Sequence, residues 1–106
     1  MDEKLFEARA KIMKSLANKH RLKVVDTLGE NIKMCVSDLV KKLDLNQSSV
    51  SKHLNILKTA GVVKAEKDGL KVYYSLRTPC IINYFVCVDN VIQNDLEDRM
   101  NVLNNK

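Results

Sequence analysis

The sequence has few of the residues that interrupt or cross-link regular structure. Its 106 residues include one proline, three glycines and no tryptophan. So few helix and strand breakers exclude a linker-rich, collagen-like or disordered chain, and they predict long regular segments that are mostly helical. The three cysteines are an odd number, which argues against a disulfide framework and favours free or ligating thiols.

Long apolar runs are also missing. No stretch approaches the roughly 20 residues that a membrane span needs, and the first residues lack the hydrophobic core of a signal peptide. We therefore expect no membrane partner and a cytoplasmic location. The length fits a single domain over residues 1–106. A domain of this size buries only about 60 to 70% of its unfolded surface, so we also expect an oligomer.

The net charge of +5 is unevenly distributed along the chain. Residues 46–77 carry six cations against two carboxylates, a net +4, whereas residues 78–106 carry a net −2. A basic centre followed by an acidic end predicts that the middle of the chain holds a polyanion and that the C-terminal end has another task.

Apolar residues recur at helical spacing through the first half of the chain. We expect a first helix from about residue 5 to a break near Asn18, and a short second helix closed by Gly29 as a left-handed cap. A third helix of about two turns covers residues 36–43. After a tight turn, Asn46 is suited to cap a fourth helix over residues 47–59.

From residue 62 the apolar period changes to two, which predicts one β-hairpin. Asp68-Gly69 is the expected two-residue turn, and the return strand begins at Leu70. Thr78 then reads as a helix cap and Pro79 as the first residue of a last helix that runs into the 90s. Nine of the twelve residues from 81 to 92 are apolar. A helix apolar nearly all round must be covered by its own domain and by a second subunit.

The third and fourth helices with their short turn predict a helix-turn-helix, and the basic hairpin makes it a winged one. The expected fold is therefore mainly α (α+β), with about five helices and one hairpin wing, in a homodimer. A recognition helix entering a major groove about 12 Å wide needs short polar side chains near its N-terminus. Gln47 can pair with an adenine edge, and Lys67 and Lys71 place cations beside the wing tip. The expected DNA-binding residues are Gln47, Ser48, Ser49, Ser51, Lys52, His53, Lys67 and Lys71.

Two stretches of the sequence resemble the ArsR/SmtB family of repressors. These are QSSVSKHL at residues 47–54 and LKTAGVV at residues 57–63, and the resemblance extends over roughly residues 5–92. It implies a homodimer whose first and last helices form the interface. It also implies that the dimer binds an inverted-repeat operator in double-stranded DNA and is released by an inducer.

The cysteines are the candidates for sensing that inducer. In the segment MCVSDL, Cys35 aligns with the family's Cys-Val-Cys-Asp-Leu metal box, but Ser37 replaces the second cysteine and is a poor ligand for a thiophilic ion. The family's zinc cage on the last helix is missing, because the only histidines are His20 and His53. The remaining candidate ligands are Cys80 and Cys87, with Cys35 as a third.

Thiols seven residues apart on one regular helix lie about 10 Å apart, too far to share an ion. Cys80 and Cys87 therefore form a site only if the first helical turn is unwound or if another thiol joins one of them. Trivalent arsenic or antimony is the leading effector hypothesis, and no cofactor is required. A second hypothesis is an oxidation or persulfide switch that pairs Cys80, at a helix start, with another cysteine. A third is that Cys35 and Cys87 are simply small core residues.

The sequence also bears on two other function classes, enzymes and protein-binding domains. The sequence has no carboxylate pair in an apolar pocket, no suggested His/Cys dyad and no Gly-rich phosphate loop, so we do not expect an enzyme. A winged helix that binds only proteins is the stronger rival to a DNA-binding repressor.

Overall fold

The computed structural model describes residues 2–104. Its elements are α1 (Glu3–Leu16), α2 (Lys19–Gly29), β1 (Met34–Cys35), α3 (Val36–Leu43), α4 (Gln47–Thr59), β2 (Val63–Asp68), β3 (Lys71–Leu76), the 3₁₀ helix η1 (Pro79–Ile81) and α5 (Ile82–Asn104). Five α-helices and a hairpin confirm the expected winged helix-turn-helix.

Short polar side chains set where the helices begin. The Asn18 side chain accepts hydrogen bonds from the backbone N–H groups of His20 (2.9 Å) and Arg21 (3.2 Å), so the expected break before α2 is a helix cap. Asp2 caps α1 in the same way through the N–H of Lys4.

The core lies where α2, α3 and α4 pack against the hairpin. Val50, Leu54 and Leu57 form one apolar face of α4, and each is completely buried. The spacing of three and four residues places them on one side of the helix. The other buried members of this cluster are Leu16, Val24, Val25, Leu28, Met34, Leu39, Val62, Val63 and Leu76.

The sheet contains a strand that the periodicity did not reveal. β1 pairs antiparallel with β3, with Met34 opposite Tyr74 and Cys35 opposite Tyr73, so the strand order is β1-β3-β2. A strand of two residues is too short to show an alternating pattern.

The hairpin turn was predicted one residue too early. Asp68 pairs with Lys71, so the two turn residues are Gly69 and Leu70. Gly69 has a φ of +66°, which a glycine in the first turn position adopts without strain. Leu70 is consequently fully exposed at the tip instead of opening the return strand.

The predicted left-handed cap at Gly29 is wrong. Gly29 is the last residue of α2, and the next residue, Glu30, has right-handed backbone angles. Packing gives the glycine another role: a Cβ at this position would lie 2.7 Å from Cδ1 of Ile82. The missing side chain lets the start of α5 approach the end of α2.

The start of the last helix also differs from the prediction. Pro79 opens the three-residue helix η1, and α5 begins at Ile82. Thr78 precedes η1 with extended backbone angles but makes no capping hydrogen bond through its side chain.

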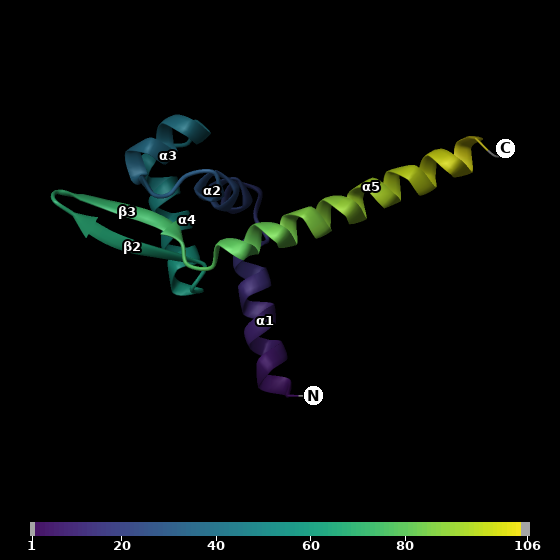
Figure 1. Ribbon diagram of the computed structural model, residues 1–106, viewed down its shortest axis with the longest axis horizontal. Helices are drawn as coiled ribbons and strands as arrows, with labels where there is room; N and C mark the ends of the chain where they lie inside the picture. Colours follow the sequence, from purple (N-terminus) through teal and green to yellow (C-terminus); the bar gives the residue numbers. More distant parts are fainter. Residues whose placement is uncertain (1, 105–106) are drawn as a thin grey trace.

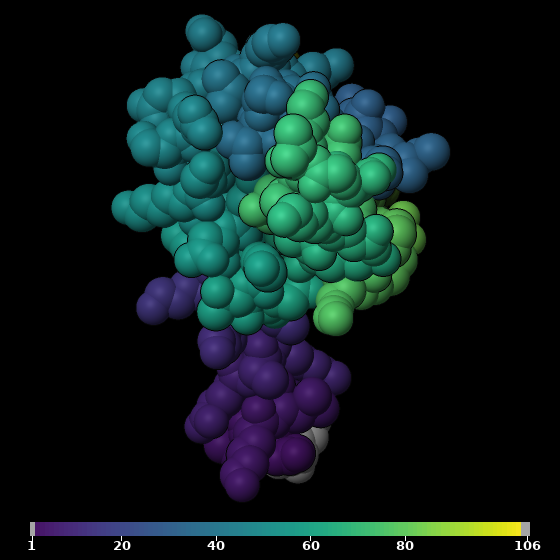
Figure 2. Space-filling view, turned by 90° about the vertical axis from the view of Figure 1, so that its left-hand side faces the viewer, coloured from purple at the N-terminus to yellow at the C-terminus, as the bar shows by residue number. Residues whose placement is uncertain are grey.

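The two terminal helices extend away from the body. In Figure 1, α1 and α5 diverge from the core in different directions, and Figure 2 shows α1 emerging below the body of the molecule. The radius of gyration is 17.0 Å, whereas a compact domain of this length has about 13 Å. Within residues 2–104, no helix is long and apolar enough to cross a lipid bilayer.

Candidate nucleic-acid interface

The geometry of the helix-turn-helix depends on one residue in a left-handed conformation. Asp44 ends α3 with a φ of +53°, a conformation that Asp adopts more readily than most residues. Two residues later Asn46 begins the next helix, because its side-chain Oδ1 accepts a hydrogen bond from the Ser49 N–H at 2.8 Å. The turn therefore reverses the chain in three residues and exposes the N-terminus of α4.

The outward face of α4 is polar and largely open. Gln47, Ser48, Ser51 and Lys52 are exposed, whereas Ser49 is half-buried. The Ser48 hydroxyl donates a hydrogen bond of 2.8 Å to Asn46 Oδ1. The structure thus brings together at one helix end most of the short polar side chains expected to face DNA.

Asn55 belongs to the same face, although it was not among the predicted residues. It is exposed and follows Ser51 by four residues and Ser48 by seven, which is one stripe of the helix. This spacing was visible in the sequence.

His53 points toward α2 and is half-buried. Its Nδ1 lies 3.5 Å from the Arg21 guanidinium, and its ring centroid is 5.9 Å from that of His20. Burial lowers the pKa of His53 below 6.5, and the charges of Arg21, His20 and Lys52 lower it further.

The wing carries both of its predicted cations on its surface. Lys67 and Lys71 are exposed on the two strands next to the tip. Asp68 lies between them, and its negative charge is neutralised by Lys33, whose Nζ lies 3.6 Å from the carboxylate. The same ammonium sits 4.6 Å from the centre of the Tyr73 ring. Lys33 precedes β1, so only the unpredicted strand pairing reveals this contact.

Cys35 is buried where β1 meets α3. Its Sγ lies 3.1 Å from the Ser37 hydroxyl, and its N–H donates to the Asp38 carboxylate at 3.2 Å. Hydrogen bonding from the Cys35 thiol and its backbone N–H lowers the pKa of Asp38. In this position the thiol is packed inside the subunit.

Cys80 and Cys87 are both exposed in the subunit. Cys80 lies in η1, so it does not occupy the second position of an α-helix as predicted. Cys87 lies on α5, and its exposure excludes the reading that it is a core residue of the isolated subunit. Within residues 2–104, no three His, Cys, Asp or Glu side chains come close enough to hold a metal ion. One subunit therefore does not unite the three cysteines.

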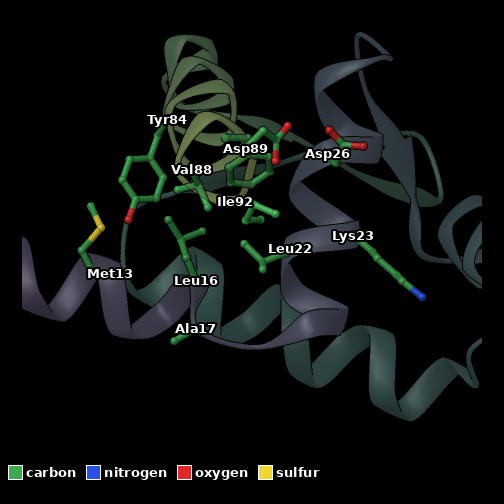
Figure 3. Close-up of a pocket in the computed structure, with 11 residues that line it drawn as sticks. Met13, Leu16, Ala17, Leu22, Lys23, Asp26, Tyr84, Val88, Asp89 and Ile92 are labelled. Atoms are coloured by element: carbon green, nitrogen blue, oxygen red, sulfur yellow. The ribbon is translucent and has the colours of Figure 1, made fainter. Parts of the chain in front are cut away.

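An apolar groove lies between the two projecting helices. Figure 3 shows Met13 and Leu16 of α1, Leu22 of α2, and Val88 and Ile92 of α5 around it. Its volume is about 660 Å³. Asp26 of α2 and Asp89 of α5 also line the groove and bring carboxylates to it.

A buried three-helix core that exposes a polar helix beside a basic hairpin defines the class of winged helix-turn-helix transcriptional regulators. These proteins are not enzymes. The family model described as bacterial regulatory protein, arsR family, matches residues 18–65. The chain is 32% identical over 101 residues to the HTH-type transcriptional regulator Rv0081 of Mycobacterium tuberculosis, covering 95% of this chain and 89% of that one. This chain belongs to the ArsR family.

Three further comparisons place the chain among known regulators. The cadmium resistance transcriptional regulatory protein CadC of Listeria innocua is 40% identical over 70 residues, which is 66% of this chain and 59% of CadC. The homodimeric winged helix-turn-helix DNA-binding domain Mb0332 of Mycobacterium bovis superposes with a TM-score of 0.78 at 27% identity, over 92% of this chain and 93% of that one. The crystal structure of Rv0081 superposes with a TM-score of 0.79 over 93% of this chain and 99% of that one, at 31% identity.

The cap at Asn46 gives a first prediction. Asn46→Ala removes the acceptor for the Ser49 N–H and should lower the free energy of unfolding by about 1 kcal/mol. Asn46→Ser keeps a capping oxygen and should retain most of that stability. Urea denaturation followed by circular dichroism measures both. An equal loss in the two variants would contradict a capping role.

The depressed pKa of His53 gives a second prediction. Because the unfolded state binds this proton more readily, the free energy of unfolding should fall as the pH drops through about 6.5. His53→Gln removes the titrating ring and should flatten this part of the pH profile. Denaturation midpoints measured between about pH 7.5 and 5.5 compare the two proteins, and parallel profiles would refute the assignment.

Proposed function

We propose that this chain is one subunit of a homodimeric repressor that binds an inverted-repeat operator in double-stranded DNA and releases it when an effector binds. The observation that carries the proposal is the exposed polar N-terminal face of α4 beside a wing with two open cations. A helix of this kind fits the major groove, and the wing lies close enough to touch the backbone at its side.

Each predicted residue has a role in this proposal. Gln47 reads an adenine edge through its side-chain amide, and the serines contact base edges or phosphates at the helix start. Lys52 and His53 contact phosphates beside the groove. Lys67 and Lys71 add sequence-independent contacts from the wing.

The exposed apolar surface of the terminal helices supports a dimer. Leu5, Phe6 and Met13 of α1 are at least 40% exposed. The exposed apolar residues of α5 are Tyr84, Val86, Val88, Val91, Ile92, Leu96, Met100, Val102 and Leu103. So many exposed large apolar side chains are rare on a monomer and mark an interaction site. The homodimeric state of the related domain Mb0332 supports the same arrangement.

A second copy filling the groove of Figure 3 with its own α1 or α5 would cover this surface. A twofold dimer presents two α4 helices, and the half-sites that they read lie about 34 Å apart, one turn of DNA.

Different substitutions should separate base reading from backbone contact. Gln47→Ala should lower affinity mainly for the operator, by about 1–3 kcal/mol, and relax base preference. Lys67→Ala and Lys71→Ala should weaken binding to every duplex and each reduce the salt slope of log K by about 1. Lys64→Ala is the matched control, because Lys64 already pairs with Glu66 at 3.7 Å near the base of the wing. Fluorescence anisotropy at several salt concentrations measures all four.

The alternative class of protein-binding winged helices predicts no binding to DNA. A winged helix that binds only proteins would show no binding to its upstream palindrome even at low salt, where phosphate contacts are strongest. That result, or a monomer in sedimentation experiments at micromolar concentration, would overturn the proposal.

The effector acts in this proposal through the exposed thiols Cys80 and Cys87. Trivalent arsenic or antimony is the leading candidate because these ions prefer sulfur ligands. A single subunit does not provide a complete set of ligands within its described residues. A metalloid would therefore need thiols from both subunits of the dimer. A persulfide donor or oxidant that modifies Cys80 is the alternative, since an exposed thiol is accessible to either.

Titration of the reduced protein on its operator distinguishes these effectors. Arsenite, antimonite, cadmium and a persulfide donor are added separately, and DNA release is followed by anisotropy. We expect Cys80→Ser and Cys87→Ser to abolish the arsenite response, whereas the buried Cys35→Ser should keep it. An unchanged arsenite response in the first two variants would remove these thiols from the site.

A further inference from the structure

A second groove, between α1 and α4, carries cationic side chains among its lining residues. Its volume is about 330 Å³. It is lined by Lys11, Lys14, Ser15, Arg21, Asn55, Ile56, Thr59 and Ala60. We infer that this groove holds backbone phosphates of the DNA duplex that flank the bases facing α4. The inference rests on the proposed function, because it assumes that α4 binds DNA.

The charge of the lining side chains favours an anion as the occupant of the groove. Three of the lining residues are cationic and none is acidic. The ion pairs among residues 2–104 are Lys33–Asp68, Lys64–Glu66 and Arg99–Asp95, so none of them neutralises the groove. Lys11 and Lys14 are exposed, and they make no side-chain hydrogen bond within that range. An anion entering the groove therefore meets unpaired ammonium groups.

The groove is continuous with the proposed DNA-binding face of α4. Asn55 and Thr59 line the groove and continue the exposed stripe that begins at Ser48 and Ser51. The helix rises 1.5 Å per residue, so Thr59 lies about 16 Å along the axis from Ser48. If the start of α4 reaches the bases, the groove lies about three helical turns away from the side chains that read them.

A dimer formed through the apolar side of α1 would leave this groove open. Lys11 and Lys14 occupy one side of α1, and the exposed apolar residues Leu5, Ile12 and Met13 occupy the other. A partner packed on the apolar side does not cover the lysines. α1 would then serve the dimer with one face and DNA with the opposite face.

A hydrogen-bonded arginine holds the two walls together. Arg21 Nε donates to the Ser15 carbonyl oxygen at the end of α1, at 2.6 Å, and its guanidinium also reaches His53 on α4. Arg21 therefore fixes the width of the groove, while the two lysines remain free to bind phosphate. Because of this structural role, Arg21 is a poor position for a binding test.

The test uses the full-length protein with Lys11→Gln, Lys14→Gln and the double variant, on the upstream duplex and on a mixed-sequence duplex. We expect an equal loss on both duplexes, since phosphate contacts carry no base information. The salt slope of log K should fall by about 0.9 per lysine. For the double variant, the drop in DNA affinity between 50 and 200 mM salt should therefore be about tenfold smaller than for the wild type. Lys4→Gln, on the same helix but outside the groove, is the control and should leave the slope unchanged.

Shortening the duplex gives an independent readout. Removing the flanking base pairs should weaken DNA binding by the wild-type protein by about the same factor as the double substitution does. The same truncation should have little further effect on the DNA affinity of the double variant. Thermal denaturation checks that the variants remain folded.

The outcomes separate this inference from the proposed function. If the wild type binds no duplex, the proposed function fails and this inference fails with it. If the wild type binds DNA and Lys67→Ala lowers the slope, but Lys11→Gln/Lys14→Gln does not, only the groove assignment is wrong. An effect of the double variant on the upstream duplex alone would also refute a phosphate role.

Discussion

The burial of one face of α4 is the constraint on which the other features depend. Val50, Leu54 and Leu57 are completely buried, and together they contact the core built by α2, α3 and the hairpin. At about 1.5–3 kcal/mol for each fully buried side chain, this face contributes a large share of the stability of so small a domain. Because those three positions must point inward, the opposite face of the helix, which carries Ser48, Ser51 and Asn55, must point outward. The polar face of α4 is therefore exposed as a consequence of the packing.

The same core is too small to cover the terminal helices. It occupies the middle of the chain, while much of α1 and most of α5 extend beyond it (Figure 1). Their exposed apolar residues would be a liability in an isolated subunit. In the proposed dimer, the partner supplies the buried surface that a chain of 106 residues does not supply for itself. Assembly and folding stability are then linked by mass action.

Local patterns in the sequence predicted most of the fold. The three-to-four residue spacing of α4 and its Asn46 cap identified the helix nearly to the residue. Errors arose where a residue's role depends on a distant segment. Gly29 looked like a cap but makes room for Ile82 of α5. β1 is only two residues long and exists because β3 returns beside it. In the candidate site, the polar stripe on α4 could be predicted from the spacing of its residues. The inward position of His53 and the contact of Lys33 with the wing depend on the tertiary structure and could not.

The unpredicted strand also joins two parts of the molecule mechanically. Cys35 is the last residue of β1 and the residue before α3, and it pairs with Tyr73 of β3. The middle of the return strand is thus attached to the residue that precedes the first helix of the helix-turn-helix, so the wing cannot turn relative to α3 without breaking this pairing. In the proposed dimer, a signal that displaces α5 would therefore change the distance between the two DNA-binding surfaces rather than the shape of either one.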